Sequence, residues 1–175
     1  MFSTIAIVIA VLIILFLGYV ARKPGFHQVT RKISIAATPE KVFPHINDLR
    51  AWEPWSPFEK KDPAIKRTYS GATAGKGSIY DFEGNNQVGS GRIEIQDTTA
   101  PSKLVITLDM IKPLAGHNVI TFTLDAHGNN TTVTWDMQGK TPFVGKIFHT
   151  LFNFDKMLGG EFEKGLADLK SLAEK

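Results

Sequence analysis

The chain contains no cysteine among its 175 residues. This absence excludes disulfide bonds, thiolate nucleophiles and cysteine-ligated metals, but it does not identify the compartment. The histidines are also few and scattered, and no two are spaced by one helical turn, as in a common zinc-binding pattern: His27, His45, His117, His127 and His149. No serine, histidine and acid arrangement can be assembled either. We therefore predict no metal site, and the sequence does not indicate a catalytic triad.

The first 21 residues contain no charged side chain. The apolar run Ile5–Val20 and its uncharged flanks are about 20 residues long, enough to cross a hydrocarbon core of about 30 Å. A cleavable signal peptide normally has a basic residue before its apolar run and small residues at its cleavage site. Here no basic residue precedes the run, and the bulky Tyr19 lies where a small residue is needed. Residues 1–23 are therefore predicted to form an uncleaved, single-pass membrane anchor.

Arg22 and Lys23 directly follow this run, and positive charge tends to remain on the cytoplasmic side. We therefore predict a cytoplasmic domain. A signal peptide, or an anchor that places the domain outside, is the alternative. From Pro24 onward the chain carries 18 basic and 17 acidic residues. Because no basic stripe is interleaved with aromatic residues, nucleic acid is not an expected partner. The sequence does not indicate an oligomeric state.

The remaining 150 or so residues suffice for one domain with a substantial core. We predict a linker over residues 24–30 and a domain over 31–175. The glycine-rich segment 71–78 resembles a phosphate-binding loop, but it has one spacer residue too few and leads into a predicted strand. No helix N-terminus would then face a phosphate, so we predict no nucleotide and no other cofactor.

Strand patterns dominate the middle of the sequence. Six segments are predicted strands: 65–70, 78–84, 91–96, 103–110, 118–124 and 131–137. In the last five, apolar residues recur at every second position. A period of two predicts an antiparallel sheet with one apolar and one solvated face. Gly84-Asn85-Asn86, residues 125–130 and Ala100-Pro101-Ser102 provide the turns.

A short strand and a capped helix precede this sheet. Ile33 and Ile35 indicate the strand, Thr38 is a suitable N-cap, and Pro39 suits a first helical turn. The helix is predicted to be short because the rigid loop Trp52-Glu53-Pro54-Trp55-Ser56-Pro57 follows it.

The C-terminal segment changes to helical periodicity. From Pro142 onward, apolar residues between Phe143 and Leu172 fall on one helical face. We expect Gly159-Gly160 to bend or interrupt this helix, because each glycine costs about 1 kcal/mol relative to alanine.

Several motifs along the chain together carry a family resemblance. They are Ile35-x3-Pro39-Glu40-x-Val42-Phe43, Asp48-x3-Trp52-x2-Trp55-Ser56-Pro57, Gly75-x-Gly77-Ser78-x-Tyr80, Gly89-x-Gly91, Thr132-Val133-x-Trp135-x-Met137 and Phe162-x2-Gly165-Leu166-x2-Leu169-Lys170. In these motifs the chain resembles the polyketide cyclase/dehydrase and lipid-transport group of the START-like (SRPBCC) superfamily. The resemblance covers about residues 30–174. It implies an α+β helix-grip fold, in which a curved antiparallel sheet wraps around a long C-terminal helix. It also implies a pocket between sheet and helix for a hydrophobic molecule, but no shared set of catalytic residues.

The leading functional prediction is a membrane-anchored binding module for a hydrophobic or amphipathic small molecule, such as a lipid. Trp52, Trp55 and Phe58 are the candidates for the pocket mouth, since large rings with a polar atom suit a boundary between water and apolar surroundings. The candidate walls are Tyr80, Phe82, Ile106, Leu108, Phe122, Trp135, Phe154 and Leu158. For each of these residues, ordinary core packing is the alternative.

Two other functions remain open. The first is a cyclase or dehydratase, which would need a carboxylate inside the pocket. Asp81 and Glu83 are the best candidates by sequence, yet they share a strand face that meets water if Tyr80 and Phe82 point inward. The second is a non-binding scaffold or stress-response protein with a collapsed cavity. A buried acid in an open pocket would favour the enzyme. A pocket lined only by carbon atoms would favour the binding module, and a solid core would favour the scaffold.

Overall fold

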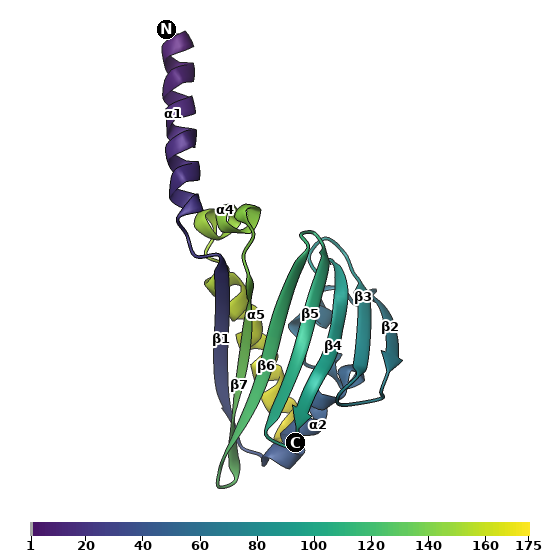
Figure 1. The fold of residues 1–175 in the computed structure, drawn as a ribbon. Coiled ribbons are helices and arrows are strands. Elements are labelled where there is room, and N and C mark those ends of the chain that lie inside the picture. Colours follow the sequence, from purple (N-terminus) through teal and green to yellow (C-terminus); the bar gives the residue numbers. More distant parts are fainter. Residues whose placement is uncertain (1) are drawn as a thin grey trace.

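A computed structural model describes residues 2–175, and it shows an α+β domain that follows one isolated N-terminal helix (Figure 1). The elements in chain order are α1 (Phe2–Ala21), β1 (Phe26–Ile35), α2 (Pro39–Asn47), the 3-10 helix η1 (Leu49–Trp52), α3 (Pro57–Lys61), β2 (Lys66–Gly71), β3 (Ser78–Glu83), β4 (Ser90–Thr99), β5 (Lys103–Lys112), β6 (Gly116–His127), β7 (Asn130–Lys140), α4 (Phe143–Leu151) and α5 (Phe154–Ala173). The helix-grip prediction is confirmed: one long helix crosses a single antiparallel sheet.

The sheet has seven strands in the order β1-β7-β6-β5-β4-β3-β2, and every neighbouring pair is antiparallel. Burial alternates along the strands as the sequence pattern predicts, with Ile106 of β5 and Phe122 of β6 completely buried on the inner face. Register shifts in β4 at Ser90/Gly91 and Ile95/Asp97 interrupt the regular ladder. Such bulges bend a strand and increase its twist, so they help the sheet to curve.

Strand β1 begins at Phe26, inside the segment predicted as a linker over residues 24–30. The reason is its pairing: β1 runs beside β7 along its whole length, from Phe26 opposite Lys140 to Ile35 opposite Thr131. Its outer face is polar, and Gln28 and Thr30 both donate to Asp136 of β7, at 2.7 and 2.5 Å. The first half of β1 therefore shows little hydrophobic periodicity. Only four residues, 22–25, separate α1 from the sheet.

Helix α5 covers the inner face of the sheet. The ring of Phe162 stacks on that of Trp135 in β7, with centroids 4.1 Å apart and planes 8° apart. Leu166 and Leu169, one and two helical turns further on, are also buried. Since α5 contacts β1 and the short helices α2 and α3 as well, it is the central element of the core.

The C-terminal helical segment is broken at a different place from the one predicted. Helix α5 continues through Gly159-Gly160, and the break falls at Phe152 and Asn153. There the Phe152 N–H donates to the Phe148 carbonyl, and the Asn153 side chain accepts from the Lys156 N–H as an N-cap. The prediction was wrong because Gly159 has a packing role: a Cβ atom at this position would collide with the guanidinium group of Arg31.

The segment between β1 and β2 closes the core. Thr38 is the N-cap residue of α2 and Pro39 occupies its first turn, as predicted, but the Thr38 side chain makes no capping bond in this part of the structure. The Trp52 indole N–H donates to the Ile46 carbonyl at 3.0 Å, and the Trp55 indole N–H donates to the His45 carbonyl at 2.9 Å. Both rings are thereby held beneath α2.

Candidate functional site

A cavity of about 420 Å³ lies between the sheet and helix α5. This volume is within the range of small-molecule sites, about 300–1,000 Å³. Most of the wall is aliphatic or aromatic, and besides the residues predicted from the sequence it includes Ile65, Val88, Ile93, Met110, Ile120, Met137 and Phe162. The core is therefore hollow, which argues against the scaffold alternative with its collapsed cavity.

Eight of the eleven candidate residues line this cavity, and they come from six different elements or connections. They are Trp52, Phe58, Tyr80, Phe82, Leu108, Trp135, Phe154 and Leu158. The strand residues among them share the inner face of the sheet, whereas Phe154 and Leu158 lie one turn apart on α5.

The other three candidates, Trp55, Ile106 and Phe122, do not line the cavity but are fully buried in the core. Trp55 contacts the rings of both Trp52 and Phe122. The two tryptophans therefore do not form the pocket mouth, because their bonds to α2 carbonyls turn them inward and leave Trp52 only 4 % exposed.

The mouth of the cavity lies at the end of the sheet from which α1 departs. Every exposed residue of the cavity wall comes from this end, either from its connections, from the end of β7 or from α4: Gln87, Pro113, Leu114, Ala115, Lys140, Pro142 and Phe148. The strand register places these connections together, since Gly116 lies opposite Met110, Asn118 opposite Gly139, and Lys140 opposite Phe26. We call this edge the α1 end, and Figure 1 shows α4 there at the base of α1.

A buried carboxylate lines the cavity beside strands β2 and β3. Glu59 of α3 is 6 % exposed and accepts a hydrogen bond of 2.5 Å from the Tyr80 hydroxyl. Its second oxygen accepts from the Arg67 Nε atom at 2.8 Å. Burial and the bond to the Glu59 carboxylate raise the pKa of Tyr80, so this hydroxyl stays protonated. The sequence reasoning missed Glu59, because a glutamate followed by two lysines on a short helix is typical of a solvated surface.

An aromatic cluster separates the cavity from a shallower hollow on the outside. The His149 ring stacks on Phe154 at 4.0 Å, and His27 meets Phe154 edge-on at 5.2 Å. These three residues line both the cavity and a second hollow of about 590 Å³ between β1 and the α4–α5 connection. Burial lowers the pKa of both histidines, and the neighbouring Asn118 side chain partly opposes this effect at His27. The cluster is therefore uncharged at neutral pH.

Trp135, one of the cavity-lining residues, carries an unpartnered donor. The indole Nε1 of Trp135 is buried, and no acceptor within residues 2–175 lies within hydrogen-bonding distance of it. An indole N–H is only a donor, and a buried one usually has a partner. An oxygen of a bound molecule is a suitable partner. No group of three or more histidine, aspartate or glutamate side chains in the described residues has the geometry of a metal site.

Together, the single antiparallel sheet, the long C-terminal helix across it and the enclosed cavity define a helix-grip domain of the START-like (SRPBCC) class. The sequence model described as "polyketide cyclase / dehydrase and lipid transport" matches residues 27–174. The chain therefore belongs to this family. Among curated proteins, no relative matches the chain significantly.

Solved structures show the same fold at low sequence identity. Protein CV1439 from Chromobacterium violaceum has a TM-score of 0.59 and 16 % identity, and the match covers 87 % of this chain and 99 % of that one. Protein MLL2253 from Mesorhizobium loti has a TM-score of 0.61 and 16 % identity, with 83 and 96 % covered. DynU16, a protein of the dynemicin biosynthetic locus, has a TM-score of 0.58 and 16 % identity, with 85 and 47 % covered.

Proposed function

We propose that this protein is a membrane-anchored binding module that holds a hydrophobic or amphipathic small molecule, such as a lipid, in the cavity between the sheet and α5. The observation that carries the proposal is the apolar cavity of about 420 Å³, with its mouth at the end that bears α1. Burial of ligand surface would supply the binding free energy, at about 25 cal/mol per Å² before the costs of binding. The family's description, which includes lipid transport, supports this assignment.

The polar atoms of the wall favour an amphipathic ligand with an oxygen acceptor. Trp135 lines the cavity and its Nε1 has no acceptor among the described residues, whereas both oxygens of the Glu59 carboxylate are already engaged by Tyr80 and Arg67. A ligand oxygen that reached this N–H would gain a hydrogen bond of about 0.5–1.5 kcal/mol, which a purely apolar ligand would not. A carbonyl, ester or hydroxyl group on an otherwise apolar molecule would supply this bond.

Helix α1 supplies the membrane anchor in this proposal. Residues Thr4–Ala21 are long and apolar enough to cross a bilayer, and nearly all of them are exposed. A signal sequence passes the same test of length and composition. Arg22 and Lys23 support a domain that stays in the cytoplasm. The anchor would keep the cavity near a membrane source of ligand, which raises the effective concentration.

Native mass spectrometry of the full chain, purified in detergent micelles, tests the proposal. We expect the wild type to retain an apolar molecule from its expression host. Leu108→Trp places a large ring in the cavity and should abolish this retention. The matched control is Thr107→Trp, because Thr107 directly precedes Leu108 in β5, points to the opposite face and does not line the cavity. A wild-type protein that carries no molecule, or a Leu108→Trp variant that carries as much as the control, would overturn the proposal.

A second candidate function, a cyclase or dehydratase, is favoured by the position of Glu59. It is the buried acid in an open pocket that such an enzyme needs. Glu59→Gln keeps the size of the side chain but removes the acid. If the protein is a dehydratase, this variant should retain a molecule heavier by one water than the wild type does. A binding module should retain the same molecule in both.

A further inference from the structure

We infer that the α1 end of the domain is a lipid-contacting surface, formed by α4 and the β5–β6 turn around the cavity mouth. In this arrangement the mouth opens onto the bilayer, so that a ligand passes between membrane and cavity without crossing water. The inference deepens the proposed function and rests on it for α1 as a membrane anchor.

The first argument is the distribution of exposed apolar side chains. Every exposed large hydrophobic side chain within residues 22–175 belongs to the start of β1, the end of β5 and its turn, α4, the α4–α5 connection, or the first turns of α5. Ile111 and Leu151 are 64 and 62 % exposed, and Leu114, Val144 and Phe152 are each more than half exposed. Soluble domains seldom gather exposed apolar residues in one place without a binding role.

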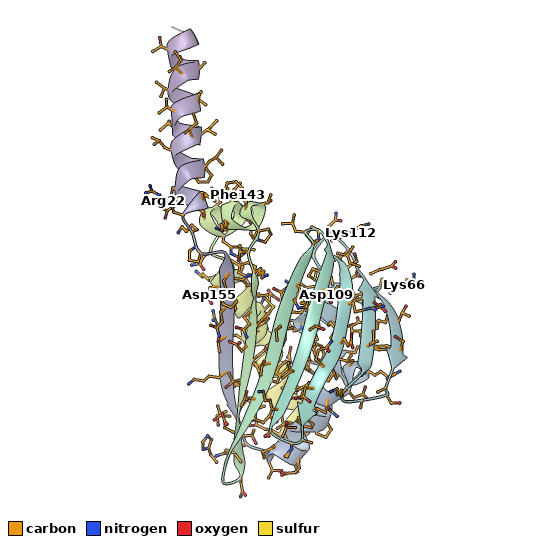
Figure 2. All side chains as sticks on the ribbon, in the orientation of Figure 1. Arg22, Lys66, Asp109, Lys112, Phe143 and Asp155 are labelled. Atoms are coloured by element: carbon orange, nitrogen blue, oxygen red, sulfur yellow. The ribbon has the colours of Figure 1, made fainter. Side chains whose placement is uncertain are left out.

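Charge is the second argument. The four segments that meet at the α1 end, 21–28, 84–89, 111–117 and 138–154, contain no aspartate or glutamate. They contain five basic residues, Arg22, Lys23, Lys112, Lys140 and Lys146. This excess is local, because the chain from Pro24 onward is nearly balanced. An apolar surface bordered by lysine and arginine is complementary to anionic phospholipid headgroups. Figure 2 shows Arg22, Phe143 and Lys112 all at this end, with Lys112 at the tip of β5.

The short link between α1 and β1, residues 22–25, provides the third argument. Four residues between α1 and β1 span at most about 14 Å, so the α1 end cannot move far from the bilayer that α1 crosses. Within this short link the Gly25 carbonyl accepts from the Thr141 N–H at 2.9 Å. Lys146 of α4 donates to the Ala21 carbonyl, the last of α1, at 3.4 Å. Helix α4 therefore packs against the base of α1, at the level where the membrane boundary lies.

These observations select a bilayer as the occupant of this surface rather than another protein. A membrane-spanning helix is continuous with it, its charge suits anionic lipid, and its apolar side chains surround the mouth of a cavity for an apolar ligand. Self-association through the same surface, or a protein partner, would be detected as a distinct outcome of the test below.

The absence of cysteine makes a site-specific test practical. Single-cysteine variants of the full chain, Leu114→Cys and Val144→Cys, carry an environment-sensitive fluorophore in vesicles of phosphatidylcholine and phosphatidylglycerol. Asn129→Cys is the matched control, because Asn129 is exposed in the β6–β7 turn at the opposite end of the sheet. Quenching is measured with aqueous iodide and with lipids that carry a spin label on the acyl chain.

We expect labels at 114 and 144 to be quenched by the spin-labelled lipid and to be several-fold less accessible to iodide than the label at 129. Equal iodide quenching at all three sites would overturn the inference. Protection from both quenchers, increasing with protein density, would show a protein–protein surface and would overturn it too.

Two further measurements separate this inference from the proposed function. Lys112→Glu together with Lys140→Glu should restore iodide access at 114 in anionic vesicles. Lys103→Glu, at the exposed start of β5 at the opposite end of the sheet, should not. Mass spectrometry of the same preparations reports bound ligand independently. If the protein retains a ligand but its labels are exposed to water, the lipid-contacting surface is contradicted and the proposed function is not. If the labels are embedded in the membrane but no ligand is bound, the proposed function is contradicted and the lipid-contacting surface is not.

Discussion

At the residue scale, the Glu59–Arg67 pair is the interaction in the cavity wall whose disruption should destabilise the protein most. The side chain of Glu59 is 5 % exposed, so loss of Arg67 would leave a buried charge without its cationic partner. We expect Arg67→Met to lower the free energy of unfolding by about 3 kcal/mol, as for other buried pairs that lose one partner. Urea denaturation measures the change.

Lys66→Met is the matched control for this variant. Lys66 is the neighbouring residue and pairs with Glu83 at 3.5 Å, but both side chains are 69 % exposed. Exposed pairs of this kind contribute less than about 1 kcal/mol. Similar losses in the two variants would show that the Glu59 carboxylate does not depend on Arg67.

The histidines predict how stability depends on pH. Burial lowers the pKa values of His27, His45 and His149 in the folded protein, whereas in the unfolded chain they return to about 6.5. Between the two values the unfolded state binds more protons, so the free energy of unfolding should fall as the pH is lowered through 6.5. The acids with lowered pKa values, such as Asp155 and Glu174, contribute only at lower pH.

Urea titrations between about pH 7.5 and pH 5 test this expectation. The double variant His27→Gln, His149→Gln should show a shallower dependence than the wild type, since it lacks two of the three groups. Wild-type stability that increases toward pH 5 would contradict the assignment of these histidines as neutral, buried groups.

Single residues also show the limits of the sequence pattern. Alternation correctly placed Tyr80, Phe82 and Leu108 on the inner face, because a strand face depends only on local periodicity. Trp52 was expected at a water boundary, yet its N–H is satisfied by an α2 carbonyl inside the protein. Glu59 became part of the cavity through partners 8 and 21 residues away in sequence, and no local pattern reports such a contact.

At the element scale, α5 offers a direct comparison of two adjacent glycines. A Cβ atom at Gly160 would meet nothing within 4 Å, so Gly160→Ala should stabilise the helix by about 1 kcal/mol. A Cβ atom at Gly159 would displace the guanidinium of Arg31, which bridges Asp155 and Glu163 across this turn. Gly159→Ala should therefore stabilise the protein less than Gly160→Ala, or destabilise it. Thermal or urea unfolding of both variants measures the difference.

An Arg31→Ala background provides the control. Without the guanidinium group, both alanine substitutions should have the same stabilising effect. A difference that persists in this background would place the cause outside Arg31.

The same pair of glycines explains why the helix break was mislocated from the sequence. Helix propensity treats Gly159-Gly160 as the weakest point, but a tertiary contact from β1 requires the first of them. The true break, at Phe152 and Asn153, contains neither glycine nor proline and depends on the Asn153 cap. Strand β1 was shortened in the prediction for a related reason, since its polar outer residues are satisfied by β7 rather than by water alone.

At the scale of the whole molecule, the helix-grip fold was predictable because its signals are periodic and repeated over six strands and a long helix. The cavity was implied only by the resemblance, since a hollow arises where packing is incomplete and no residue encodes it alone. Its mouth was not predictable, because the mouth forms where three connections distant in sequence meet α4 at one edge of the sheet. The four residues 22–25 then keep this edge close to the end of α1.

The central claim is that the cavity holds an apolar chain taken from the membrane. Photoaffinity labelling tests it most directly: the full chain in bilayers is irradiated with a lipid whose acyl chain carries a diazirine, and the adducts are located by mass spectrometry. The account predicts adducts on α1 and the mouth, and also on inner cavity residues of β3, β5 and α5 such as Phe82, Leu108 and Leu158. Adducts confined to α1 and the outer surface, with none inside the cavity, would contradict it.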